Sequence, residues 1–334
     1  LPILLVTCNR AALLRRTLTS LLSVRGVTRE AVFVVQDGAA GDVAAVVNEF
    51  GLRYHQKVAT QVKLRGGRPP DGAERISQHY KYSLSYMFQA VTTAPAIIVV
   101  EDDFLFAPDF YEYFHAVAPV VEADPSVWLA SAWHDNGFAG IATDAAALRR
   151  TSYFPGLGWL LPRDLFLTEL AAKWPKSHWD HWMRDARQHR DRDVIIPEMP
   201  RDYHIGVKGT FMDASTHNKY FRDIAVNVDA SFRWDTDAAT AALRQVTAAP
   251  YDGALRQAIS GARALDSAPA VAAFSSGVGV VWYSASIKPV PTNRNQFRYM
   301  AAYFGVWHEG VRGARRGVHM VRWVHGSTVY LVNV

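Results

Sequence analysis

One short apolar run decides what this chain can fold into. Residues 96–100 (AIIVV) are entirely apolar and lead directly into three consecutive acids, Glu101, Asp102 and Asp103. A run of this length predicts a strand buried on both faces, as in the parallel sheets of α/β proteins. In open sheets of that class, ligands bind beyond the carboxyl ends of the strands, which is where the three acids would lie.

Three adjacent carboxylates repel one another, so ionising all of them is costly unless a cation lies nearby. Mg²⁺ or Mn²⁺ would take one or two carboxylate oxygens and complete its ligands with phosphate oxygens of a substrate. The acidic segment therefore has two interpretations. It is either a solvated turn or a divalent-metal site for a sugar-nucleotide diphosphate, where the metal neutralises charge on the leaving group.

Length and composition set the outer bounds. The chain has 334 residues, of which 49% are apolar and 20% charged, which suits one large domain and a smaller one. No apolar run approaches the roughly 20 residues that span a bilayer. Because the chain starts without Met, inside the apolar run 1–6, we expect a catalytic fragment whose targeting segment lies outside it. Cys8 is the single cysteine, which excludes an intrachain disulfide.

The formal net charge of +5 suits an anionic ligand, a nucleic acid or an anionic membrane surface. The most basic stretch, 312–322 (RGARRGVHMVR), lacks the regular alternation of basic and aromatic residues found on nucleic-acid platforms. We interpret it as a solvated turn before a strand. No nucleic-acid partner is expected.

Apolar periodicity predicts alternating strands and helices over the first two thirds of the chain. Expected strands or apolar segments are 4–7, 31–35, 52–56, 96–100, 127–133, 154–161 and 193–197. Expected helices are 13–22, 42–50, 73–90, 108–118, 165–174 and 179–189. Two glycine-containing segments, 63–72 and 203–209, are expected to be loops, the first able to close over a ligand and the second mobile. The alternation predicts an α/β fold with a largely parallel sheet.

The character of the chain changes after about residue 228. Alanine-rich helical segments at 237–248 and 255–265 are followed by β-rich segments at 277–284 and 318–332. We therefore predict a larger α/β domain over 1–228, which carries the candidate site, and a smaller α+β domain over 229–334.

A second acidic candidate lies in the segment 176–184 (KSHWDHWMR). In a helix, Asp180 lies about 100° around the axis from Trp179, so a carboxylate would stand beside an aromatic wall. Indole faces pack against sugar rings, and a carboxylate there could remove a proton from an acceptor hydroxyl. The alternative is structural, because Ser177 three residues before Asp180 resembles a capping box.

Three further residues are candidates for nucleotide binding. Arg10 follows the first expected strand and could meet a phosphate, while Asp37 follows the second and could accept a hydrogen bond from a base. His79, in the helix before the acidic strand, could stack on a nucleobase. Taken singly, such residues are more often surface or structural ones. The chain has no GxSxG, P-loop or zinc-ligand spacing, which disfavours α/β-hydrolases and NTPases.

With these segments in order, the chain resembles the inverting glycosyltransferase family that contains N-acetylglucosaminyltransferase I and protein O-mannose β-1,2-N-acetylglucosaminyltransferase. The resemblance runs nearly end to end and implies the GT-A fold. It is carried by the segments 99–103 (VVEDD), 107–110 (APDF), 131–133 (SAW), 154–159 (FPGLGW), 173–175 (KWP) and 179–184 (WDHWMR).

The resemblance implies a role for each acid. Asp103 would be the direct Mn²⁺ ligand, and Glu101 and Asp102 would face the donor sugar and its ribose. Asp180 would be the catalytic base that deprotonates the acceptor hydroxyl.

It also implies roles on the donor side. Arg10 matches the family's phosphate contact, and Asp37 and His79 match its uracil-side contacts. Trp179 would belong to the wall beside the sugar, and the loop after Gly206 matches one that orders over the bound donor.

The implied activity is metal-dependent, inverting transfer of GlcNAc from UDP-GlcNAc to the 2-hydroxyl of an α-mannoside, forming a β-1,2 linkage on a glycoprotein glycan. Family members are Golgi type II membrane proteins, which implies a Golgi lumen location with an anchor outside this chain.

Alternatives stay open. The 203–204 pair (YH) is closer to the O-mannose enzyme, and 210–213 (TFMD) differs from the donor-covering loop of N-acetylglucosaminyltransferase I. Cys8 matches a disulfide-bonded position of that enzyme, but the partner position here is Gly38. The same chemistry with another UDP-sugar or acceptor, or a non-catalytic carbohydrate- or nucleotide-binding protein, remains possible. A metal phosphohydrolase is disfavoured because no second cluster of metal ligands appears.

Overall fold

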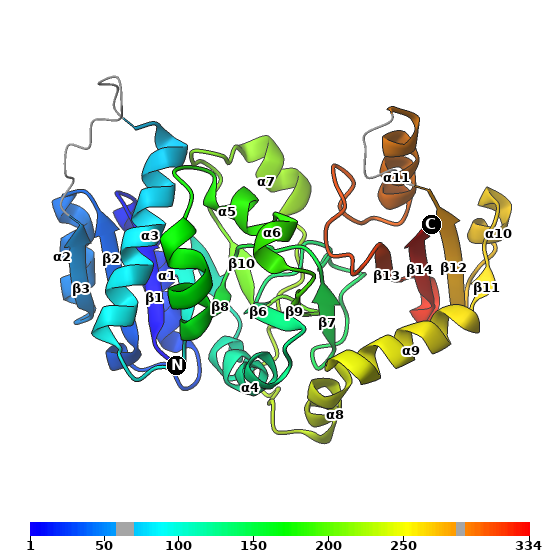
Figure 1. Cartoon of the computed structure of the whole chain (residues 1–334), viewed down its shortest axis with the longest axis horizontal. Coiled ribbons are helices and arrows are strands. Elements are labelled where there is room, and N and C mark those ends of the chain that lie inside the picture. The colour runs from blue at the N-terminus through cyan, green and yellow to red at the C-terminus, as the bar shows by residue number, and fades with distance from the viewer. Residues whose placement is uncertain (58–69, 285–290) are drawn as a thin grey trace.

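A computed structural model describes residues 1–57, 70–284 and 291–334 (Figure 1). The strands are β1 Ile3–Thr7, β2 Val32–Asp37, β3 Arg53–Lys57, β4 Ala96–Glu101, β5 Phe104–Phe106, β6 Val127–Ser131, β7 Leu148–Thr151, β8 Trp159–Pro162, β9 Asp193–Pro197, β10 Asp202–His204, β11 Arg263–Ala264, β12 Val278–Tyr283, β13 Val318–Arg322 and β14 Thr328–Asn333. The α-helices are α1 Ala11–Ser23, α2 Gly41–Glu49, α3 Gly72–Ala90, α4 Phe110–Ala123, α5 Trp179–Met183, α6 Ala186–His189, α7 Ala214–Tyr220, α8 Asp237–Gln245, α9 Ala248–Ser260, α10 Ala268–Ala272 and α11 Pro291–Tyr303.

The larger part of the molecule is built on an eight-stranded sheet with the order β3-β2-β1-β4-β8-β6-β9-β7. Strands β3, β2, β1 and β4 run parallel to one another, as do β6 and β9. Strand β8 is antiparallel to both β4 and β6, and β7 is antiparallel to β9. The predicted α/β class with a largely parallel sheet is confirmed. A separate two-stranded pair joins β10 to β5.

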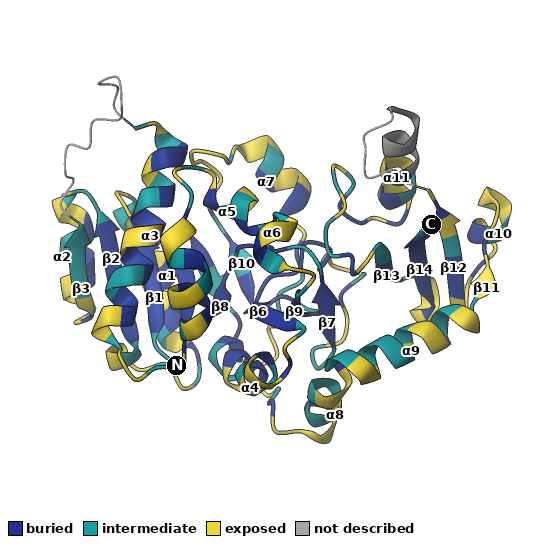
Figure 2. Ribbon diagram, in the orientation of Figure 1, coloured by how far each residue is buried: buried dark blue, intermediate teal, exposed yellow. Residues whose placement is uncertain are grey.

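Alternate residues of the central strands face two hydrophobic cores. In β4, Ile98 and Val100 belong to the core that includes α1, α2 and α4, while Ile97 and Val99 belong to the core that includes α3. The first five residues of β4 are all buried, which is why the run is apolar throughout rather than alternating. In Figure 2 the inner strands of this sheet, such as β1 and β2, are dark blue, whereas the edge strand β3 is only partly buried.

The C-terminal part contributes a four-stranded sheet with the order β11-β12-β14-β13, at the opposite end of the molecule from β3 (Figure 1). Leu265, Phe297 and Leu331 belong to its core. Trp234 and Ala239, by contrast, still pack in a core of the large sheet. Val246 belongs to the same core, so the change from one core to the other lies after residue 246, and the division into domains at 228/229 stays a prediction.

Several expected elements differ from those observed. The helix expected over 179–189 is two helices, because Asp185 caps α6 by accepting from Arg187 N. Residues 165–174 form a π-helical turn, Leu165–Leu170, and a 3₁₀ turn, Ala171–Lys173, instead of an α-helix. Most of the loop expected over 63–72 lies outside the described residues, and Gly72 is the first residue of α3.

The basic stretch 312–322 is not a solvated turn. Arg315 is 4% exposed, and its Nε donates to Asp193 over 2.7 Å. Arg322 lies at the end of β13 and contacts Glu198. Both arginines pair with buried carboxylates. The number of basic residues in a sequence segment does not show such pairing. Among the helices described here, none is both long and apolar enough to cross a bilayer.

One buried carboxylate ties the segments that flank the site. Asp109, fully buried before α4, accepts from Arg201 Nε (2.6 Å), Asn227 Nδ2 (2.9 Å) and Trp234 Nε1 (2.8 Å). Arg201 is also fully buried and immediately precedes β10. The position of β10 therefore depends on this network.

We expect Asp109→Ala to lower the free energy of unfolding by about 3–5 kcal/mol, because it leaves the Arg201 guanidinium buried without its counter-charge. Urea denaturation measures the loss. Asp223→Ala, which removes an exposed ion pair with Arg222, is the control and should leave the midpoint unchanged. Equal midpoints for the two variants would contradict a stabilising role of the network.

Candidate functional site

Parallel pairing brings the predicted residues to one edge of the sheet. The carboxyl ends of β1, β2 and β4 lie side by side, with Thr7 opposite Gln36 and Val6 opposite Glu101. Arg10 follows β1, Asp37 ends β2 and Glu101 ends β4. The expected gathering of charged residues at this edge is present.

Each acid at the end of β4 has different partners. Glu101 accepts a hydrogen bond from the Tyr80 hydroxyl. Asp102 accepts from Thr7 Oγ1 (2.6 Å) and from Arg10, so both its oxygens are engaged. Asp103 is 2% exposed and accepts from Arg10 Nη1 over 2.6 Å. The segment is therefore a buried, partnered structure and not a solvated turn.

These partners set the charge of the cluster. Burial, together with the charge of Asp103, raises the pKa of Glu101 to about 7. Burial also raises the pKa of Asp102, although Arg10 opposes the shift. Burial pushes the pKa of Asp103 upward as well, but His204 and Arg10 outweigh it and the net pKa lies below the ordinary value. Asp103 is thus the acid held most firmly as a carboxylate.

Asp103 also has the clearest capacity for a cation. Its Oδ1 is buried and has no hydrogen-bond partner. Gly206 lies against it, since a Cβ there would stand 2.3 Å from Asp103 Oδ2 and 3.0 Å from His204 Cε1. The donor chemistry and the missing side chain both fit a hard divalent cation at Asp103.

The surroundings of Asp103 do not complete a metal site from protein alone. Within residues 1–57, 70–284 and 291–334, no three side chains of His, Cys, Asp or Glu gather to hold a metal ion. A cation at Asp103 would take most of its ligands from substrate phosphate and water.

The segment expected to be a mobile loop over 203–209 begins as a strand. Asp202–His204 forms β10, and His204 pairs with Phe104 of β5. Ile205 N then donates to Asp103 O over 2.8 Å. Sequence periodicity cannot reveal a three-residue strand, so His204 was missed as a neighbour of Asp103.

Asp180 is the second residue of α5, with its side chain 35% exposed. Its Oδ2 accepts from Arg184 Nη1 over 2.7 Å, and Arg184 Nε donates to Phe154 O over 3.0 Å. The residue before α5 is His178, which has a left-handed backbone and makes no side-chain cap. The capping-box interpretation of Asp180 is therefore wrong, and its carboxylate stays available at the surface.

The aromatic residue beside Asp180 is buried. Trp179 is 5% exposed and stacks on Tyr80 at 4.1 Å, with Trp159 at 5.8 Å and Trp174 at 5.9 Å. The open wall that we expected at Trp179 is thus an internal stack. Its effect is to join α5 to the acidic strand end, because the same Tyr80 donates to Glu101.

Two predicted nucleotide contacts have partners within the protein. Asp37 pairs with Lys57 Nζ at 3.2 Å. His79 is 5% exposed, with Nε2 at 3.1 Å from Thr7 O and Nδ1 at 3.3 Å from Ser83 Oγ. Burial lowers the pKa of His79 to about 4, which keeps the ring neutral. Their contacts with a base stay predictions.

The C-terminal segment reaches the neighbourhood of Asp180. The guanidinium groups of Arg184 and Arg312 lie 4.7 and 5.0 Å from the centre of the Tyr153 ring. Arg312 also pairs with Asp135, a buried residue after β6, at 3.2 Å. Sequence spacing gave no sign of this contact, which joins residues 177 positions apart.

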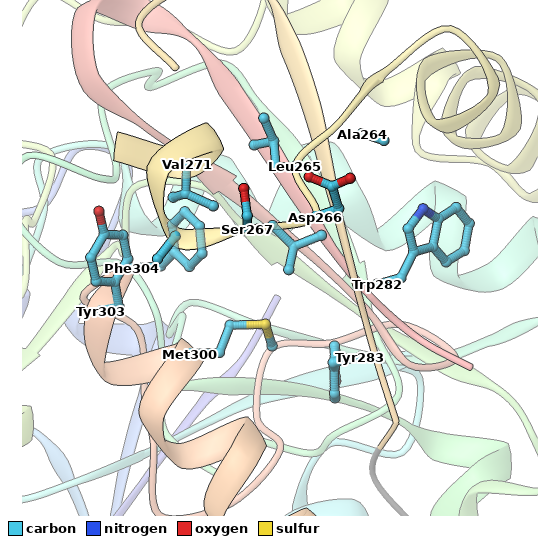
Figure 3. Close-up of a pocket in the computed structure, with 12 residues that line it drawn as sticks. Ala264, Leu265, Asp266, Ser267, Val271, Trp282, Tyr283, Met300, Tyr303 and Phe304 are labelled. Carbon is cyan, nitrogen blue, oxygen red and sulfur yellow. The ribbon is translucent and has the colours of Figure 1, made fainter. Parts of the chain in front are cut away.

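A separate cavity of about 440 Å³ lies beside the second sheet (Figure 3). It is lined by residues of β11, β12, α10 and α11 and their flanks, namely Ala264, Leu265, Asp266, Ser267, Ala268, Val271, Val281, Trp282, Tyr283, Met300, Tyr303 and Phe304. None of the predicted site residues lines it.

The acidic strand end, the arginine beside it and the carboxylate on an adjoining helix lie where α/β proteins bind their ligands. The model of the GNT-I family matches residues 1–334, so the chain belongs to the GNT-I family. The resemblance inferred from the sequence is confirmed.

A curated relative is alpha-1,3-mannosyl-glycoprotein 2-beta-N-acetylglucosaminyltransferase of Arabidopsis thaliana, 33% identical over 237 residues. The match covers 70% of this chain and 52% of the relative, so the chain spans about half the length of the relative.

Two solved structures are similar at lower identity. TarS of S. aureus with UDP-GlcNAc is 12% identical, with a TM-score of 0.43 over 63% of this chain and 60% of that one. The mannosyltransferase PcManGT of Pyrobaculum calidifontis, with GDP-Man and Mn²⁺, is 15% identical, with a TM-score of 0.38 over 81% and 77%. Likenesses this weak carry no argument, and the family assignment rests on the match along the chain.

We expect Gly206→Ala to weaken metal-dependent UDP binding at least about tenfold, because its Cβ would collide with the Asp103 carboxylate. Calorimetric titration of UDP with and without Mn²⁺ measures the effect. Gly253→Ala, at a helix position with no atom within 4 Å of the added Cβ, is the matched control and should bind as the unaltered chain does. Unchanged binding by Gly206→Ala would show that Asp103 is not used.

Asp202, an acid that the sequence analysis did not single out, generates a prediction about pH. Asp202 is fully buried, and neither of its carboxylate oxygens has a partner. Gly158, with φ +44°, leaves room for it, because a Cβ there would stand 2.0 Å from Asp202 Oδ2. Burial raises the pKa of Asp202 well above its ordinary value.

In the unfolded chain Asp202 ionises near pH 4, whereas its pKa in the folded protein lies well above that value, so stability falls as pH rises above about 4. Asp202→Asn removes this loss. We expect the variant to be more stable at neutral pH, with a difference that grows by at most about 1.4 kcal/mol per pH unit and disappears near pH 4. Urea midpoints measured from acid to neutral pH test this, and a difference independent of pH would refute it.

Proposed function

We propose that this protein transfers GlcNAc from UDP-GlcNAc to the 2-hydroxyl of an α-mannoside, with inversion, in a metal-dependent reaction. The observation that carries the proposal is the physical connection between the two acidic candidates. Tyr80 donates to Glu101 beside Asp103 and stacks on Trp179, whose neighbour is Asp180. Family membership and the name of the Arabidopsis relative support the choice of sugar and linkage.

On the donor side, this chain's residues bind and neutralise the diphosphate. Asp103 would hold the metal through its carboxylate, and bound Mn²⁺ would supply Lewis-acid stabilisation of the negative charge that develops on UDP. Arg10, with its side chain 29% exposed, is placed to exchange its carboxylate partners for a phosphate. Asp37 at the end of β2 would accept from the uracil N–H.

On the acceptor side, Asp180 acts as general base. Its carboxylate would take the proton of the mannose 2-hydroxyl as that oxygen attacks the anomeric carbon. Arg184 orients the carboxylate through the hydrogen bond that its Nη1 donates to Asp180 Oδ2. A single displacement of this kind needs one base and forms no covalent intermediate, so the anomeric configuration inverts.

The finer assignments belong to the same proposal. The acceptor would be a mannose-containing glycan of a glycoprotein. The expected location is the Golgi lumen, with a membrane anchor outside this chain, as for the family described above. A different UDP-sugar or acceptor, and a binding protein without turnover, are the alternatives that experiment must separate.

We expect Asp180→Asn to lower the rate of UDP release from UDP-GlcNAc, measured with Mn²⁺ and an α-mannoside, by at least about 10²-fold. Donor binding should survive. The amide cannot accept the proton but preserves the shape of the side chain. UDP release and UDP calorimetry, run on the same preparation, measure the two properties. Asp191→Asn makes the same chemical change at an exposed aspartate and is the control. This variant should keep full activity.

A panel of UDP-sugars, with and without acceptor, separates the alternatives. Release from another UDP-sugar would move the donor specificity and keep the mechanism. Full activity in Asp180→Asn would refute the assignment of the base. Metal-dependent UDP binding with no turnover of any donor would favour the binding-protein alternative.

A further inference from the structure

The cavity beside the second sheet lies where β12 loses its neighbouring strand (Figure 3). β11 pairs with β12 only at Gly279 and Val280, and Leu265 N also donates to Val280 O over 2.8 Å. Asp266 and Ser267 then lead into α10, so the cavity opens along residues 281–283 of β12. The opening is therefore set by the path of the backbone and does not depend on one side-chain rotamer.

Two exposed aromatic side chains flank this cavity. Trp282 on β12 is 52% exposed, and Tyr303 on α11 is 54% exposed. In Figure 3 they stand on opposite sides of the cavity, with Ser267 and Asp266 between them. All ten tryptophans lie within the described residues, and Trp282 is the only one of them that is exposed. A ligand that covers this indole would gain the free energy of removing it from water.

The cavity also presents hydrogen-bonding groups. Asp266 and Ser267 are exposed at its wall. Tyr283, which lines it as well, is 3% exposed, and its hydroxyl has no hydrogen-bond partner among the described residues. Burial raises the pKa of Tyr283 to about 12, so this hydroxyl keeps its proton and can donate. A buried polar group without a partner is uncommon, and a polar ligand in the cavity would satisfy it.

This combination of groups matches the surface of a sugar ring. A pyranose has faces of C–H bonds and a rim of hydroxyl groups, so its face can pack on the Trp282 indole while its hydroxyls bond to Asp266 and Ser267. A wholly apolar ligand would cover Asp266 without giving it a hydrogen bond, and a phosphate would be repelled by it. The volume of about 440 Å³ lies within the range of roughly 300–1,000 Å³ that is usual for small-ligand sites.

We propose that this cavity is a second carbohydrate-binding site, which takes a neutral hexose ring of a glycan and stacks it on Trp282. The site is separate from the candidate active site, because the described residues that line it include none from the acidic strand end or from α5. Sugar binding here does not require transferase activity. Its consequence for catalysis does rest on the proposed function, since a glycoprotein held by one sugar at Trp282 presents its other mannose units at a raised effective concentration.

The most direct test observes Trp282 in the unaltered chain. We would label the protein with 5-fluorotryptophan, record ¹⁹F NMR spectra and assign the Trp282 resonance by its disappearance in Trp282→Phe. Methyl α-mannoside and N-acetylglucosamine are added separately, up to about 50 mM, because a single stacked ring is expected to bind in the millimolar range. We expect the Trp282 resonance to shift saturably with at least one of them. Mannitol, a polyol without a ring, is the control and should not shift it.

Two tyrosines of α11 form a matched pair of variants. Tyr299 and Tyr303 are both exposed, but of the two only Tyr303 lines the cavity. We expect Tyr303→Ala to weaken sugar binding, followed through the Trp282 resonance, at least about tenfold. Tyr299→Ala should bind the sugar as the unaltered chain does. Thermal unfolding shows whether each variant is folded.

Kinetics test the consequence for the acceptor. With a glycoprotein that carries several mannose-terminated glycans, Trp282→Ala should raise KM at least about tenfold and leave kcat unchanged. With methyl α-mannoside as acceptor, both constants should equal those of the unaltered chain, because so small an acceptor cannot bridge two sites. An unchanged KM for the glycoprotein would overturn the acceptor role of the cavity.

The outcomes separate this inference from the proposed function. A Trp282 resonance that moves with neither sugar, or equally with mannitol, would overturn the site and leave the transferase proposal intact. Equal sugar binding by Tyr303→Ala and Tyr299→Ala would do the same. A shift caused by a valine- and threonine-rich strand-forming peptide, and by neither sugar, would assign the open edge of β12 to peptide pairing and overturn the site. Sugar binding at Trp282 in a chain without any transferase activity would support the site and overturn the proposed function.

Discussion

Three carboxylates at the end of β4 lie in or near the protein interior, where uncompensated negative charge is costly. Each is accommodated differently. Tyr80 donates to Glu101, Thr7 and Arg10 donate to Asp102, and Asp103 shares Arg10 while keeping one oxygen free. The surrounding elements are placed by this requirement. β1 brings the threonine, the turn after it brings the arginine, and α3 brings the tyrosine.

The gross architecture was predictable because it follows from patterns that are local in sequence. Short apolar runs such as 96–100, bounded by polar residues, are typical of strands buried on both faces, and their polar ends mark one edge of the sheet. The neighbours of Asp103 were not predictable, since His204 lies on a strand of three residues and is brought there by pairing across about 100 positions. The burial of Trp179 was equally hidden, because sequence does not show what covers an indole.

The two acidic candidates belong to one mechanical unit. The Tyr80 hydroxyl donates to Glu101 at the end of β4, and its ring stacks on Trp179 of α5. A displacement of β4 or α5 would therefore also move the other element. Arg184 extends this unit to Phe154 O, and Tyr153 connects it to Arg312 near the C terminus. The acidic strand end, Asp180 and the C-terminal segment are therefore linked through direct contacts, and a substitution in 312–322 can shift the candidate site from a distance.

The hydrogen bonds of Asp109 also bear on the order in which the protein can be made. Its partners Arg201, Asn227 and Trp234 lie 92, 118 and 125 positions away along the chain. During synthesis, β1 to β4 can form long before these partners have left the ribosome. The Asp109 network that holds β10 is complete only once Trp234 has emerged. Until then, the acids at the end of β4 lack the covering strand β10. Such non-local closure slows folding, and a nascent chain arrested before that point would hold the acids without the strand that covers them.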